Sequence, residues 1–259
     1  PPWTALPWRR PENGVFCMNK LYVVGIGAGN YEGMTVGAVR ALERVEVIVG
    51  YTVYCALVQP YFPDKTYLST PMLGEIERCR MALRSASAGK ATAMICSGDA
   101  GIYGMASPVY ELAAEYDTEI EVIAGVTAAA SGAALLGAPL AHDFCAISLS
   151  DRLTPLELIE RRIECAATSD MSIVFYNPSS KKRSDYLRRA CKILLKYKSP
   201  DTVCGIARNI GRREEAFEVM TLAELCRYNA DMFTTIFVGS MSTVRLGGKM
   251  VTPRGYEHV

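Results

Sequence analysis

Short apolar segments alternate with amphipathic segments along most of the chain, beginning at Leu21. The apolar segments are rich in β-branched residues, which predicts buried strands. The amphipathic segments repeat their apolar residues with helical spacing. The predicted strands are 21–25, 45–49, 91–96, 119–124, 144–149, 171–176, 202–207 and 233–239, and the predicted helices are 34–44, 74–88, 107–116, 127–136, 155–167, 183–196 and 221–228. This alternation is typical of an α/β protein with largely parallel sheets.

The segment Gly137–Ala138–Pro139 interrupts this pattern between a helix of small residues and the next strand. We therefore expect an N-terminal α/β domain at 18–138 and a C-terminal α/β domain at 139–259. A cleft between them should receive strand-end loops from both, because open α/β sheets bind ligands beyond the carboxyl ends of their strands. Residues 1–17 are rich in proline and resemble no signal peptide, so we treat them as an extension outside the site.

Composition narrows the class of protein. The chain has 259 residues, half of them hydrophobic, and a net charge of +1. The charges are interspersed, which argues against a nucleic-acid partner, and no unbroken apolar stretch could span a bilayer. Nine cysteines without a CxxC pair argue against a zinc ribbon or an iron–sulfur cluster. We expect a cytoplasmic protein with reduced cysteines and no metal site.

The first glycine-rich loop, "VVGIGAGN" at 23–30, follows a predicted strand and precedes a predicted helix. A dinucleotide site needs GxGxxG and an acidic residue at the end of the next strand. Here Asn30 replaces the last glycine, and the next strand ends in Gly50 and Tyr51. The loop therefore predicts either close approach of another ligand or a tight turn without a ligand.

Three further loops follow predicted buried strands: "SGDAGIYG" at 97–104, "AGVTAA" at 124–129 and "FYNPSS" at 175–180. Glycine allows a ligand to approach the backbone, and the carboxylate of Asp99 can accept hydrogen bonds from a hydroxyl or an amine. Thr127 is expected to cap the next helix and to donate to a ligand. Each loop alone could be a structural turn, but three together favour a shared site.

The stretches "GIGAG", "MTVGAVRALE", "CSGDAGIYGM", "GVTAA", "LLGAPLAHDF", "ISLSDRLTP", "FYNPSSKKR" and "MVTPRGY" resemble the tetrapyrrole methyltransferases of cobalamin synthesis. The resemblance extends from about Leu21 to Tyr256. The segment "HDFCAISLSDRLTP" is similar to the subgroup that methylates ring carbon 17. The resemblance implies two α/β domains, a homodimer, a tetrapyrrole substrate, and S-adenosylmethionine in the cleft between the domains.

The resemblance also implies site residues. The cofactor contacts that it implies are Gly98, Asp99, Ile102, Tyr103, Thr127, Ala128, Tyr176, Asn177, Ala207, Arg208 and Thr235. The substrate contacts that we expect are Gly27, Ala28, Gly29, Tyr54, Asp151 and Lys181. Ala28 stands where the family usually has proline, which should loosen the first loop without changing the chemistry.

Methyl transfer from a sulfonium needs alignment and exclusion of water more than it needs a strong nucleophile. The resemblance also implies ring contraction, which needs acid–base help. Our candidates are His142, Asp143 and Tyr51, because histidine titrates near neutral pH and the tyrosine follows a predicted strand. His142 could equally be a hydrogen-bonded histidine between the domains. Tyr51 and Tyr54 could be ordinary aromatic packing, and Asp151 and Lys181 could be solvated.

Three rival functions stay open from the sequence. They are a methyltransferase acting at another ring carbon, a nicotinamide-dependent oxidoreductase, and a tetrapyrrole carrier without catalytic activity. The subgroup segment argues against the first, the missing ribose acid against the second, and the cofactor loops against the third. The sequence does not decide between a cobalt-bearing and a metal-free substrate.

Overall fold

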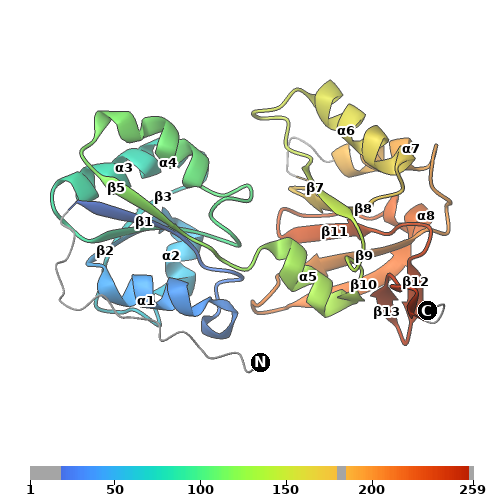
Figure 1. Cartoon of the computed structure of the whole chain (residues 1–259), viewed down its shortest axis with the longest axis horizontal. Helices are drawn as coiled ribbons and strands as arrows, with labels where there is room; N and C mark the ends of the chain where they lie inside the picture. Colours follow the sequence, from blue (N-terminus) through green and yellow to red (C-terminus); the bar gives the residue numbers. More distant parts are fainter. Residues whose placement is uncertain (1–18, 180–184, 257–259) are drawn as a thin grey trace, which may run out of the picture.

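The computed structural model describes residues 19–179 and 185–256 and contains two five-stranded sheets (Figure 1). Helices cover both faces of each sheet. The first half comprises β1 (Lys20–Gly25), α1 (Val36–Arg44), β2 (Val47–Tyr51), α2 (Thr52–Val58), β3 (Thr66–Thr70), α3 (Glu75–Ser87), β4 (Thr92–Cys96), α4 (Ala106–Leu112) and β5 (Glu119–Ile123), with 3-10 turns at Tyr31–Gly33 and Ala113–Glu115.

The second half carries the other large sheet and a small three-stranded sheet of β12, β13 and β6. Its elements are α5 (Ala128–Leu136), β6 (Gly137–Ala138), β7 (Phe144–Ser148), α6 (Leu156–Thr168), β8 (Ser172–Tyr176), α7 (Tyr186–Leu194), β9 (Val203–Arg208), β10 (Ala216–Thr221), α8 (Leu222–Leu225), β11 (Thr234–Val238), β12 (Val244–Leu246) and β13 (Lys249–Val251).

The first sheet has the order β3-β2-β4-β1-β5, and all its strands run parallel. Both of its faces are buried, which explains the continuous apolar strands. Along β1, Val23 packs in the cluster beneath α3 and α4, whereas Val24 packs in the cluster beneath α1 and α2. Because the strands are parallel, all their carboxyl ends lie at one edge of the sheet.

The second sheet has the order β10-β9-β11-β8-β7, and only β7 and β8 pair in parallel. The expectation of largely parallel sheets is therefore right for the first sheet and wrong for the second. The physical reason is the short connection between β9 and β10, which reverses the chain as a hairpin instead of crossing over through a helix.

The sequence pattern did not predict the helix α2 or the strands β3, β6, β10, β12 and β13. Strands β3 and β10 are partly exposed and are interrupted by polar residues, so neither has the continuous apolar run used to find the others. Strands β6, β12 and β13 have only two or three residues each. Helix α2 contains threonine, valine and cysteine, which have low helix propensity. Among the described residues, no helix combines the length and the hydrophobicity needed to cross a membrane.

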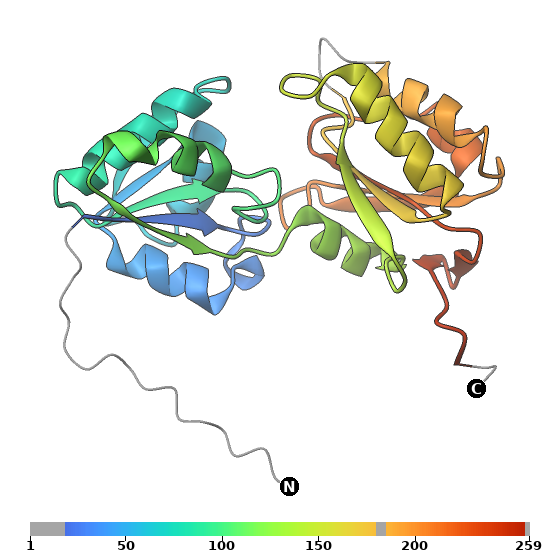
Figure 2. The same ribbon diagram turned by 45° about the horizontal axis from the view of Figure 1, so that its top comes forward.

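Helix α5 belongs with the second sheet. It contacts β9, β10, β11 and β13, and a Cβ at Gly132 would lie 2.8 Å from the ring of Phe237. The stretch after β5 leads across from the first half to this helix (Figure 2). The expected boundary between 138 and 139 thus divides the chain later than the packing does, because the glycine–proline signal follows the helix and does not precede it.

Candidate functional site

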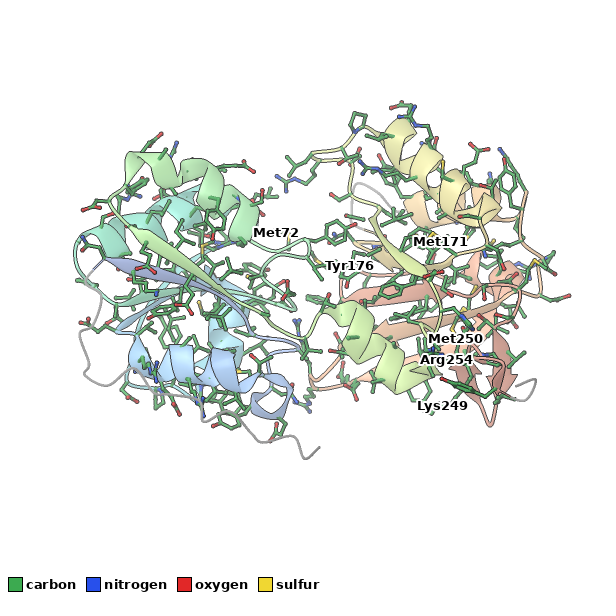
Figure 3. All side chains as sticks on the ribbon, viewed as in Figure 1. Met72, Met171, Tyr176, Lys249, Met250 and Arg254 are labelled. Carbon is green, nitrogen blue, oxygen red and sulfur yellow. The ribbon has the colours of Figure 1, made fainter. Side chains whose placement is uncertain are left out.

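A cavity lies at the carboxyl ends of the strands of the first sheet and is lined by residues from both halves. Figure 3 shows Met72 and Tyr176, which come from the two halves, near the place where the halves meet. The cavity is lined by thirteen residues that the sequence had singled out: Gly27, Ala28, Tyr51, Tyr54, Gly98, Asp99, Ile102, Tyr103, Thr127, Ala128, Tyr176, Asn177 and Thr235. It is also lined by ten that it had not: Met72, Ser97, Val126, Ser131, Asn209, Ile210, Arg212, Met232, Phe233 and Thr234.

Three strand-end loops pack backbone against backbone at the floor of the cavity. A Cβ at Gly25 would lie 2.7 Å from both the backbone N of Gly125 and the carbonyl oxygen of Gly98. The amide of Gly27 donates to the carbonyl of Gly98 at 3.0 Å, and the amide of Gly98 donates back at 2.7 Å. The glycines of the first loop therefore serve loop-to-loop packing, and this packing brings Gly27 and Ala28 to the cavity.

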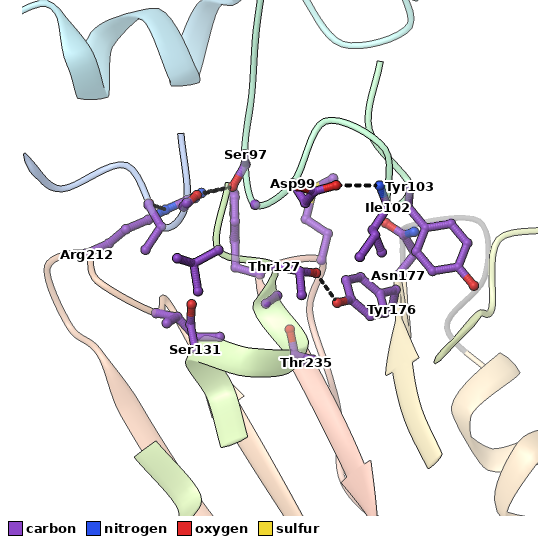
Figure 4. A pocket seen from close by; sticks show the side chains of 18 of the residues that line it. Ser97, Asp99, Ile102, Tyr103, Thr127, Ser131, Tyr176, Asn177, Arg212 and Thr235 are labelled. Carbon is purple, nitrogen blue, oxygen red and sulfur yellow. Dashed lines mark hydrogen bonds between the residues drawn. The ribbon is translucent and has the colours of Figure 1, made fainter. Parts of the chain in front are cut away.

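Asp99 holds two of these loops together with its side chain. Its Oδ1 accepts from the amides of Gly101 at 2.8 Å and Ile102 at 3.1 Å, and its Oδ2 accepts from the amide of Gly125 at 2.9 Å. Figure 4 shows Asp99 and Ile102 at the cavity. A carboxylate has about four acceptor positions, and three are used here. The aspartate expected to contact a ligand thus first fixes the shape of the loop that surrounds the ligand.

The start of α5 is tied to the second sheet by Tyr176. The Tyr176 hydroxyl lies 2.5 Å from Oγ1 of Thr127 and accepts from the amide of Ala129 at 2.9 Å. Thr127 occupies the N-cap position, but its own side chain accepts no capping hydrogen bond. The capping role expected for Thr127 is therefore taken by the tyrosine hydroxyl, which satisfies an amide that the helix start leaves without a partner.

Tyr103 links the first half to the edge of the second sheet. Its hydroxyl donates to the carbonyl of Ala146 at 2.9 Å and accepts from the amide of Ser148 at 3.1 Å. Burial raises the pKa of this phenol. Tyr103 has a φ of 52°, and Asn177 and Asn209, which also line the cavity, have 50° and 51°. Left-handed backbone at non-glycine residues gathers at functional sites, where the surrounding structure maintains it.

One wall of the cavity combines aromatic rings and cations. The rings of Tyr51 and Tyr54 meet edge to face with their centroids 5.1 Å apart. The guanidinium of Arg78 lies 5.8 Å from the ring of Tyr51, and that of Arg212 lies 5.8 Å from the ring of Tyr54. Burial raises the pKa of Tyr54, and the two nearby arginines oppose this shift. The Tyr54 phenol is therefore neutral at physiological pH.

His142 and Asp143 lie away from this cavity, and the geometry gives no support to their expected catalytic role. They precede β7, whereas the cavity lies at its other end, about 17 Å along a strand of this length. His142 is exposed, and its Nε2 lies 2.8 Å from the carbonyl oxygen of Pro253. The carbonyl of Asp143 accepts from the amide of Ser172. The alternative of a hydrogen-bonded histidine fits, although both partners belong to the second half.

Four other expected contacts also lie outside the cavity lining. Ala207 is fully buried in β9 among residues that α5 covers, and Arg208 follows it. Gly29 lies beside Leu57 of α2. Asp151 accepts a hydrogen bond at 2.7 Å from the hydroxyl of Tyr186 on α7. Lys181 lies outside the described residues.

Arg212 is a charged residue that lines the cavity and that the sequence pattern did not predict there. It belongs to the loop 209–215 between β9 and β10 and reaches across to the first half. The signal was present in "ARNIGRREE", which follows a predicted strand in the same way as the glycine loops do. Because the sequence pattern did not predict strand β10, it did not predict the hairpin that brings this arginine to the cleft.

Comparison with known proteins places this arrangement in a family. The sequence matches Tetrapyrrole (Corrin/Porphyrin) Methylases over residues 20–226. A cobalt-factor III methyltransferase of Priestia megaterium is 44% identical over 244 residues, covering 92% of this chain but only 45% of that relative. A probable cobalt-factor III C(17)-methyltransferase of Salmonella typhimurium is 46% identical over 238 residues, covering 91% of this chain and 99% of the relative.

The architecture agrees with the sequence comparison. The crystal structure of the methyltransferase CobJ matches with a TM-score of 0.84 and 36% identity. The match covers 91% of this chain and 100% of that one. The arrangement of two α/β halves is thus shared with a solved methyltransferase. The chain belongs to the tetrapyrrole (corrin/porphyrin) methylases.

Proposed function

We propose that the protein transfers a methyl group from S-adenosylmethionine to ring carbon 17 of cobalt-factor III, with contraction of the macrocycle, in cobalamin biosynthesis. The observation that carries this proposal is the 46% identity to the Salmonella relative, which extends along nearly the whole of both chains. Metal-free precorrin-3B is the alternative substrate of the same chemistry.

The residues at one end of the cavity fit the methyl donor. Gly98 has a φ of 70°, and a Cβ there would lie 3.7 Å from both Thr127 and Ala128, so glycine keeps a slot open between two loops. Three of the acceptor positions of Asp99 serve the loops, so we infer that Thr127, Ser131, Asn177 and Thr235, which also line the cavity, supply polar contacts to the donor together with backbone groups. Bound there, the donor would supply a methyl group to the electron pair of carbon 17 and leave as the neutral thioether.

The chain itself mainly orients the reactants and keeps water away from them. Asp99 holds the loop at 97–104 against the loop at Gly125, and Tyr103 links the first half to β7. These two contacts fix the sides of the cavity relative to each other. The neutral phenol of Tyr54 can donate a hydrogen bond to a substrate oxygen. Of the three catalytic candidates from the sequence, Tyr51 is the one that lines the cavity, and we propose it as the group that assists ring contraction.

Assembly as a homodimer in the cytoplasm is part of the same proposal and can be tested by light scattering. The chemical test is anaerobic incubation with cobalt-factor III and trideuteromethyl S-adenosylmethionine, followed by mass spectrometry. We expect a product heavier by one labelled methyl group, with the absorption spectrum of a contracted ring. A reaction without the methyl donor is the control.

The other outcomes assign a different function. Labelled product with precorrin-3B, and none with cobalt-factor III, would make the metal-free compound the substrate. No product from either compound, by a protein that binds the donor, would refute methylation at carbon 17. A protein that bound the macrocycle but not the donor would be a carrier.

A further inference from the structure

Arg212 is held rigidly at the boundary between the two halves. Its Nη2 donates to Oγ of Ser97 at 3.0 Å, and its Nε donates to the carbonyl of Ala28 at 3.3 Å (Figure 4). The guanidinium also lies 5.8 Å from the centroid of Tyr54 and 5.6 Å from that of Phe233. Two hydrogen bonds and two rings therefore fix its position before any ligand arrives.

The charge of Arg212 has no carboxylate partner among the residues that the structure describes. Within residues 19–179 and 185–256, no carboxylate forms a salt bridge with it. A guanidinium has five N–H donors, and the two hydrogen bonds named above use two of them. The remaining donors belong to a side chain that lines the cavity.

The surroundings add to this positive character. Arg78 is 5% exposed and donates to Oγ1 of Thr70 and to the carbonyl of Pro71, and it likewise forms no salt bridge with a described residue. It lies behind Tyr51 in the same wall. A fixed guanidinium with unused donors, in a partly buried wall that carries positive charge, can bind a carboxylate through paired hydrogen bonds.

We propose that Arg212 binds a side-chain carboxylate of the tetrapyrrole and so sets the orientation of the macrocycle in the cavity. This inference rests on the proposed function, whose substrate carries many carboxylates. The methyl donor also has a carboxylate, but Arg212 and Asn177 lie at opposite ends of the cavity in Figure 4. The aromatic wall around Arg212 suits a flat macrocycle, which places the tetrapyrrole at this end.

The binding test compares Arg212→Gln with Arg213→Gln, because Arg213 is an exposed arginine of the same loop. Fluorescence titration would measure the Kd of the polycarboxylate uroporphyrin III and of mesoporphyrin, which carries far fewer carboxylates. Losing a charged hydrogen-bond pair should weaken uroporphyrin binding about tenfold to a hundredfold in Arg212→Gln and mesoporphyrin binding about twofold. Arg213→Gln should match the wild type.

The affinity for S-adenosylhomocysteine separates the two sources of carboxylate and also verifies folding. It should stay within about twofold of the wild type in both variants, since no hydrogen-bond pair with the donor is lost. An equal loss for both porphyrins would overturn the proposal, as would a loss for S-adenosylhomocysteine alone. Arg212→Lys keeps the positive charge but not the planar fork of donors. Its affinity for uroporphyrin should therefore lie between that of Arg212→Gln and that of the wild type. An affinity equal to that of Arg212→Gln would count against the proposal.

Turnover distinguishes failure of this inference from failure of the proposed function. If the wild type methylates cobalt-factor III, Arg212→Gln should raise KM about tenfold or more, with a smaller change in kcat. An unchanged KM would refute the role of Arg212 and leave the function intact. A wild type that shows no turnover, but loses uroporphyrin affinity through Arg212→Gln, would refute the function and retain the carboxylate site.

Discussion

Replacing Asp99 by asparagine tests whether this residue acts through the loops or through the ligand. An asparagine oxygen can still accept from the amides of Gly101 and Ile102. Its NH2 group then faces the amide of Gly125, so two donors meet where a charged hydrogen bond of 2.9 Å existed. The loss of one charged hydrogen bond should lower the free energy of unfolding by about 1.5 to 3 kcal/mol.

The same variant should bind the cofactor product less tightly. If the loop must be reordered on binding, the affinity for S-adenosylhomocysteine should fall about tenfold to a hundredfold, since each 1.4 kcal/mol is about one factor of ten. Calorimetric titration measures the affinity, and urea denaturation measures stability. Asp117→Asn, a change at an exposed acid of the same half, is the control. Weaker binding with unchanged stability would refute the loop argument, because it would mean that Asp99 contacts only the ligand.

Three other changes test the architecture. Gly125→Ala should prevent folding or lower the free energy of unfolding by several kcal/mol, because its Cβ would lie 2.5 Å from the carbonyl oxygen of Gly25. Gly101→Ala is the control, since the atom nearest to its Cβ would be 3.4 Å away, and it should fold with a melting temperature close to that of the wild type. Tyr176→Phe removes the partner of Thr127 and of the α5 amide, so urea denaturation should show a loss of about 1 to 2 kcal/mol, and no loss would mean that the hydroxyl is dispensable. Burial raises the pKa of the Cys96 thiol to about 11 and that of Cys204 to about 12, so both stay protonated in the folded protein at a pH where they ionise in the unfolded chain. Stability should therefore fall between about pH 9 and pH 11, by up to about 1.4 kcal/mol per pH unit for each thiol, and a flat profile in urea denaturation across this range would contradict that reasoning.

The sequence by itself determined most of the buried strands and most of the loops that line the cavity. Strands such as Val47–Tyr51 and Thr92–Cys96 are apolar on both faces, and this local pattern is legible without a fold. The glycines and Asp99 could be predicted as site residues because they follow predicted strands, and a parallel sheet has the carboxyl ends of its strands at one edge. Thirteen of the twenty residues singled out for the site line the cavity as a consequence.

Only the tertiary structure decided the direction of strands in the second sheet and the contacts between distant loops. His142 was a candidate because histidine titrates near neutral pH, but the direction of β7 puts it at the end of the strand away from the cavity. Arg212 enters the cavity because a hairpin brings it to Ser97, which lies 115 positions away in the sequence. The hydrophobic period of a segment predicts which of its residues are buried. Contacts between residues that are far apart in the sequence depend instead on how whole helices and strands pack, and no single segment contains that information.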